Sequence, residues 1–282
     1  MINKLRPMIT TLALLATAAR ADDMAQKGRE IFKASQHAVV TVQVVLKYSG
    51  GARSSNPTET KTDATGTVVD PSGLTVLALS SVDPAELYRR ISEESKMETE
   101  VTDVKILLDD GTEMPAEIVL RDKDLDLAFV RPKAKPAAPM AAVDLSKSSA
   151  VEMLEPVIVL NRLNRAAGRA YSASIERIAA VIQKPRTFYI PETSGSAISL
   201  GSPAFALNGN IVGLFVMRAV SAPDSNARNM RENMTAILIP AEDILKGAKQ
   251  APEAKGEAEK PADKPAEKPA ATKDQKDTKD QK

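Results

Sequence analysis

The feature that most limits the possible folds is a series of short apolar runs, bounded by turn residues, that extends from residue 38 to residue 240. The runs are rich in Val, Ile and Leu, and Gly, Pro, Asn and Asp mark the breaks between them. This pattern is typical of antiparallel strands in a sandwich or barrel. A Pro- and Ala-rich segment over residues 132–141 divides the runs into two halves of about six each. We therefore predict an all-β protein of two packed six-stranded β-barrels.

Turn chemistry indicates which runs pair. An Asp-Pro-Ser-Gly turn joins two apolar runs within residues 66–79, and an Asp-Gly turn follows the run that ends near residue 110. Asn208-Gly209, the residues that most readily accept positive φ, would join the runs before and after it in a hairpin. We expect residues 49–63 to be a polar loop. Short helices are expected over residues 22–34, 83–97 and 241–248.

The first residues predict export. Lys4 and Arg6 precede an apolar run from Met8 to Ala19, and Ala19-Arg20-Ala21 supplies small residues for cleavage. These are the parts of a secretory signal peptide, so we assign residues 1–21 to one. The run is shorter than the roughly 20 residues that span a bilayer, which leaves a short membrane anchor as the alternative. We expect a periplasmic or extracellular protein of a bacterial envelope, with no transmembrane span.

The remaining chain divides into three parts. Residues 22–139 would form the N-terminal helix and first barrel, and residues 140–248 the second barrel and closing helix. Residues 249–282 contain no aromatic residue and no Val, Ile or Leu, so they cannot bury enough apolar surface to fold. We expect a disordered, mixed-charge tail, with a docking arm as the alternative.

Composition excludes several classes of function. The chain has 38 basic and 37 acidic residues, and this balance argues against nucleic acid or anionic lipid as a partner. No cysteine is present, which excludes disulfides and thiolate metal sites. Residues 122–126 begin like a calcium loop, but the glycine and glutamate that such a loop needs do not follow. We predict no metal and no cofactor.

Four segments resemble the trypsin-like serine proteases, in particular the HtrA/Deg-type bacterial branch. They contain the hairpin leading to Ser80, the Asp-Gly turn followed by Asp124-Leu125-Asp126-Leu127-Ala128, a strand after the linker, and the loop and hairpin around Pro203 taken with a strand before the last helix. The segments cover residues 66–83, 108–130, 156–161, 199–213 and 235–240. The resemblance implies a chymotrypsin-like pair of barrels and, in the family, a His-Asp-Ser triad in that chain order.

The triad positions carry other residues in this chain. The resemblance aligns the histidine, aspartate and serine of the family with Ser80, Asp126 and Leu200, and an oxyanion-hole glycine with Ile198. Leu200 has no nucleophilic atom, and a β-branched residue at Ile198 resists the backbone geometry of an oxyanion hole. The single histidine, His37, precedes the first strand, a position that lies far from the site in the family.

We therefore interpret the chain as a pseudoprotease with no intact catalytic residue. It would bind extended peptides or unfolded protein by strand addition in the cleft between the barrels. One alternative is an active serine endopeptidase with atypical residues, in which a shifted alignment makes Ser194 the nucleophile or a lysine serves as the base. A purely structural envelope protein is the other alternative. The sequence does not determine the oligomeric state.

Overall fold

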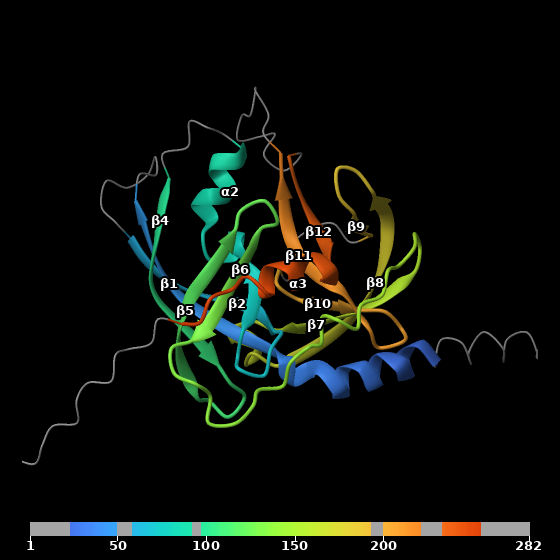
Figure 1. Cartoon of the computed structure of the whole chain (residues 1–282), viewed down its shortest axis with the longest axis horizontal. Helices are drawn as coiled ribbons and strands as arrows, with labels where there is room; N and C mark the ends of the chain where they lie inside the picture. Colours follow the sequence, from blue (N-terminus) through green and yellow to red (C-terminus); the bar gives the residue numbers. More distant parts are fainter. Residues whose placement is uncertain (1–22, 50–57, 92–96, 193–199, 221–232, 255–282) are drawn as a thin grey trace, which may run out of the picture.

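The computed structural model describes residues 23–49, 58–91, 97–192, 200–220 and 233–254 (Figure 1). The expected signal peptide over residues 1–21 lies outside these ranges, as does most of the expected tail. Figure 1 shows two barrels side by side, the first in blue and green and the second in yellow and orange, with helix α3 between them.

Within the described residues, each barrel closes from six antiparallel strands. The first contains β1 (Val39–Ser49), β2 (Thr58–Val68), β3 (Thr75–Ala78), β4 (Glu98–Leu107), β5 (Glu113–Asp122) and β6 (Leu127–Pro132). The second contains β7 (Pro156–Arg162), β8 (Tyr171–Ile182), β9 (Phe188–Pro191), β10 (Pro203–Phe205), β11 (Ile211–Ala219) and β12 (Met234–Pro240). The order around the first is β1-β2-β3-β6-β5-β4, and the second repeats it as β7-β8-β9-β12-β11-β10. The predicted fold, two packed six-stranded barrels, is confirmed.

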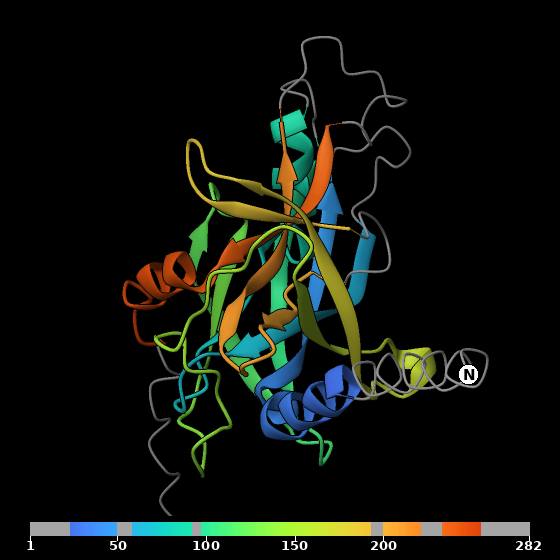
Figure 2. The ribbon, with the colours of Figure 1, turned by 90° about the vertical axis from the view of Figure 1, so that its right-hand side faces the viewer.

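The described residues also form three α-helices. An α-helix over residues 23–35 runs along the outside of β7, where a Cβ on Gly28 would lie 3.4 Å from Ile158 (Figure 2). Helices α2 (Pro84–Ile91) and α3 (Ala241–Ala248) follow strands of the first and second barrel, respectively. Three turns of 3-10 helix complete the elements: η1 (Gln36–Ala38), η2 (Leu79–Ser81) and η3 (Arg165–Ala167).

One expectation about loops needs correction, whereas the hairpin predicted at Asn208-Gly209 is confirmed. The predicted loop over residues 49–63 is wrong at its end, because β2 begins at Thr58 and pairs with the far end of β1. The first residues of β2 are exposed and polar, so no apolar run marks them. In the hairpin after β10, only Gly209 has positive φ (85°), and the turn closes with a 2.9 Å bond from its N–H to the Ala206 carbonyl.

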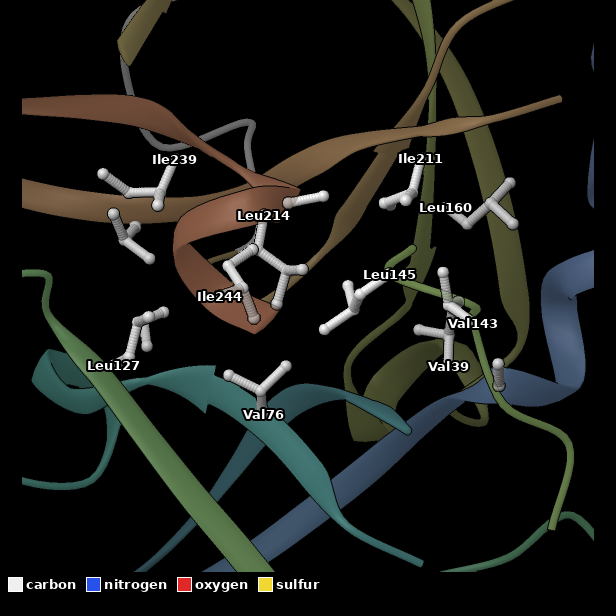
Figure 3. Packing of buried hydrophobic residues seen from close by; sticks show 14 of the residues in the cluster. Val39, Val76, Leu127, Val143, Leu145, Leu160, Ile211, Leu214, Ile239 and Ile244 are labelled. Carbon is white, nitrogen blue, oxygen red and sulfur yellow. The ribbon is translucent and has the colours of Figure 1, made fainter. Parts of the chain in front are cut away.

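The largest apolar core lies between the barrels. Figure 3 shows Val76 and Leu127 of the first barrel facing Leu214 and Ile239 of the second, with Ile244 of α3 beside them. Separate clusters fill the interior of each barrel. An apolar core shared by both barrels fixes their relative position, because separating them would expose all of these side chains to water.

Polar bonds cross the same interface. The hydroxyl of Thr65 in β2 donates to the side-chain carbonyl of Asn161 in β7 at 2.9 Å. Two residues further along β2, the hydroxyl of Thr67 donates to the backbone carbonyl of Gly201 at 2.9 Å. Both threonines are buried. One face of β2 therefore holds the segment that precedes β10 against the first barrel.

Candidate functional site

The site is built around Asp126, which lies in the turn before β6. Its backbone has φ of 58°, and only 4% of the residue is exposed. One carboxylate oxygen accepts the backbone N–H of Ser80 at 2.8 Å. The other accepts the Ser80 hydroxyl and the backbone N–H of Met217, each at 2.8 Å. Three donors, two from the first barrel and one from the second, thus surround this carboxylate.

Burial dominates the electrostatics of this carboxyl group. Removal from water raises the pKa of Asp126, because the charged form is the one that loses hydration, and the net pKa is about 6 against an ordinary value of 3.8. The bonds from Met217 and Ser80 and the nearby positive charge of Arg90 act in the opposite direction and offset part of that rise. The group is therefore a buried acid that titrates near neutral pH.

Ser80 occupies the position that the family alignment gives to the base. It lies in η2, a 3-10 turn that begins where β3 ends. The backbone N–H of Leu79 donates to the Asp126 carbonyl at 2.8 Å, so the turn is fixed to Asp126 through main chain and side chain together. Ser80 is only 9% exposed. Its hydroxyl is a donor to a carboxylate inside the protein.

Leu200, which the resemblance aligns with the nucleophile, packs against the core between the barrels and is partly buried. The structure thus brings Ser80 and Asp126 into direct contact, while Leu200 presents an apolar side chain to the shared core. Ile198, which the resemblance aligns with the oxyanion hole, lies outside the described residues, and so do Ser194 of the shifted alignment and the neighbouring Ser199.

The segment after Leu200 requires glycine. Gly201 has φ of 88°, and a Cβ there would lie 2.1 Å from the backbone oxygen of Thr65. Its N–H donates to the Phe215 carbonyl at 2.7 Å. Ser202 is fully buried, and its hydroxyl has no hydrogen-bond partner among the described residues. The chain here passes too close to β2 for any larger residue at position 201.

His37 belongs to a different cluster. Its Nδ1 lies 2.9 Å from the carboxylate of Asp109 and 3.2 Å from the hydroxyl of Tyr171. Arg162 donates to the same carboxylate at 2.7 Å and lies over the Tyr171 ring. Burial raises the pKa of Asp109, but the bonds from Tyr171, His37 and Arg162 outweigh it, so the pKa lies below its ordinary value. The cluster links the start of the first barrel to β7 and β8.

The edge of β11 beside Asp126 is the part of the site that sequence reasoning missed. The N–H and C=O of Phe215 face the segment before β10, whereas Val220 donates to Asn233 on the opposite side. Since these directions alternate along a strand, Met217 and Ala219 face the same side as Phe215. The Met217 N–H bonds Asp126, and no described strand lies beside Ala219 on that side. The apolar run predicted strand β11. The side to which each backbone N–H of that strand points depends on the pairing register, which the sequence does not show.

The described residues contain no cluster of three His, Asp or Glu side chains arranged to hold a metal ion. In the same part of the chain, every helix is too short or too polar to cross a bilayer.

Comparison with known proteins places this geometry in a family. No curated protein matches the chain at a significant level. Among solved structures, the chain is similar to the MamO protease domain of Magnetospirillum magneticum in its apo form, with 16% identity and a TM-score of 0.47 over 77% of this chain and 98% of that one. The model of the trypsin-like peptidase domain matches residues 64–214, a span that includes Ser80, Asp126 and Leu200. The chain belongs to the trypsin-like peptidase family.

Proposed function

We propose that this protein is an exported pseudoprotease that holds an extended peptide segment between its two barrels without cleaving it. The observation that carries the proposal is the environment of Asp126. In an active triad this carboxylate orients an imidazole, which takes the proton from the nucleophile. Here three of the about four acceptor positions of the carboxylate are occupied by the N–H and hydroxyl of Ser80 and the N–H of Met217, and no imidazole is among the donors.

The chemistry of hydrolysis lacks its other two groups. The only histidine of the chain bonds Asp109 and Tyr171 in a separate cluster, so it is not at the distance of about 3 Å that a general base needs from a nucleophile at this site. Leu200 stands where the nucleophile would lie. Loss of nucleophile or base alone costs about six orders of magnitude in turnover in the well-studied subtilisin case. Binding through the same cleft needs neither group.

The edge of β11 supports binding by strand addition. A peptide aligned beside Ala219 could exchange two main-chain hydrogen bonds with it, and the carbonyl of Met217 lies on the same side. Such main-chain bonds supply affinity that depends little on sequence, and side-chain pockets add preference. The apolar core between the barrels keeps this edge and the first barrel at a fixed separation. Export rests on residues 1–21, whose charge and hydrophobic pattern are those of a signal peptide.

The test combines two measurements on the full chain. Incubation with a fluorophosphonate probe and unfolded casein should give neither a labelled serine nor cleavage, with an active trypsin-like protease as the positive control. A peptide array should show binding of extended peptides under the same conditions. Labelling at Ser80, Ser194, Ser199 or Ser202 together with cleavage would establish an active endopeptidase. Absence of both cleavage and peptide binding would leave the structural envelope role.

A further inference from the structure

A small pocket between the barrels gathers three arginines beside the β11 edge. It has a volume of about 80 Å³. The first barrel contributes Arg90 from α2 and the turn at Asp124 and Leu125. The second contributes Arg186 from the loop before β9, Phe188 at the start of β9 and the last strand residues of β11, including Arg218. Elements that are far apart in the sequence therefore place three arginines around one pocket.

These guanidinium groups have few partners within the protein. Arg90 lies 4.0 Å from Glu86, but that carboxylate is closer to Arg89 at 2.7 Å and to Lys123 at 3.1 Å. In the part of the chain that the structure describes, no carboxylate lies within ion-pair distance of Arg186 or Arg218. Charged groups that line a recess without a counterion favour a ligand of opposite charge.

Arg218 is held in place by an aromatic ring. Its guanidinium carbon lies 4.9 Å from the centroid of the Phe188 ring, within the range of a cation–π interaction. Phe188 is buried, so the ring restricts the arginine to the wall of the pocket. Asp124 is the single acidic residue of the lining, which leaves an excess of two positive charges.

The size of the pocket limits what it can accept. Sites for whole small molecules usually have volumes of about 300–1,000 Å³. A space of about 80 Å³ holds only a small group, such as a carboxylate with one or two methylenes. Since Met217 and Ala219 contribute both to the pocket and to the strand edge, a peptide paired with that edge would have a side chain beside the arginines.

We propose that this pocket accepts an aspartate or glutamate side chain of the bound peptide, so that the protein selects acidic segments. The inference rests on the proposed peptide-binding function and specifies its ligand. Arg186 and Arg218 would pair with the carboxylate, and Arg90 would supply charge from the opposite barrel. Arginine suits this role because its planar group donates two parallel hydrogen bonds to a carboxylate.

Fluorescence polarisation on the full chain tests the proposal. The probes are labelled peptides of one length and one Ala/Ser/Val background, each with a single Glu at a different position, and matched peptides with Gln. At one position the Glu peptide should bind about tenfold more tightly than its Gln partner. Arg186→Gln should weaken that preference, and Arg186→Glu, which leaves the lining with equal numbers of positive and negative groups, should abolish it. Arg165→Gln, at an arginine outside the pocket, is the matched control and should leave the preference unchanged.

The outcomes separate the two proposals. Peptides that bind equally with Glu or Gln at every position, or a Glu preference that survives in both Arg186 variants, would overturn the acidic pocket and leave peptide binding intact. If no peptide of any composition binds the natural chain, both proposals are wrong. Thermal unfolding of each variant is the folding control. Because Arg186 is exposed and its replacement removes no core contact, the variants should unfold at the same temperature as the natural chain.

Discussion

Replacing Asp126 by Asn tests whether burial or hydrogen bonding governs the central carboxyl group. A carboxyl group whose pKa is higher in the folded than in the unfolded chain stabilises the fold when it is protonated. Its contribution to the free energy of unfolding is complete below the unfolded pKa and is lost as pH rises through the folded pKa. For Asp126 this contribution is lost between about pH 3.8 and pH 6, the unfolded and folded pKa values. A difference of about two units corresponds to about 3 kcal/mol, of which about 2 kcal/mol falls between about pH 4 and pH 7.

Urea unfolding followed by far-UV circular dichroism measures the effect. The free energy of unfolding of the natural chain minus that of the Asp126→Asn variant should increase by about 2 kcal/mol from about pH 7 to pH 4, because all other titrating groups cancel. Asp144→Asn is the control with opposite sign, since hydrogen bonds from Ser146 lower the pKa of this exposed carboxyl group. If the difference for Asp126 decreases toward acid pH, the bonds from Ser80 and Met217 outweigh burial and the reasoning is refuted.

Three further changes test the interface between the barrels. Gly201→Ala should lower the free energy of unfolding by more than about 2 kcal/mol, because the added Cβ would meet the backbone oxygen of Thr65. Gly209→Ala is the control: its φ is similar but no atom lies within 4 Å of the added Cβ, so it should cost only about 1 kcal/mol. Equal costs in denaturant titrations would contradict the close approach at Gly201. Thr67→Val removes the bond to the Gly201 carbonyl and should cost about 1 kcal/mol in the same assay, and a neutral result would count against that bond. The pKa of the half-exposed Asp109 is lower in the folded than in the unfolded chain, so this carboxylate stabilises the fold at pH values above its unfolded pKa, and the stabilisation is lost on acidification. Asp109→Asn should therefore reduce the loss of unfolding free energy below about pH 4, by less than about 1 kcal/mol because solvent screens the group. An unchanged pH profile would contradict the assignment.

Turn residues and apolar runs predicted the barrels because most strands contain a buried apolar stretch that is bounded by turn residues. The predictions failed where strands are polar. Strand β4 begins at Glu98, well before the apolar run near residue 104, and β2 begins at Thr58 rather than near residue 66. Both extensions pair with the far end of β1 and expose most of their side chains. Polar pairing of this kind leaves no hydrophobic pattern in the sequence.

The site could be predicted only in part. Resemblance to the family brought Ser80 and Asp126 together, and the structure joins them by two hydrogen bonds. The third donor, Met217, could not be predicted, because the direction of a backbone N–H depends on strand register. The arginine pocket was also missed, since its members come from α2, β11 and the loop before β9 and share no spacing in the sequence.

The shared core and the bonds across it have a consequence for the kinetics of binding. Thr65, Thr67 and Asp126 each join the first barrel to a fixed point of the second, so the cleft that we propose to bind peptides would have a fixed shape before a ligand arrives. A preorganised receptor loses little conformational entropy on association, and only the ligand must be ordered. We therefore expect association rates to depend on how readily a peptide straightens, and dissociation rates on the side chains it presents.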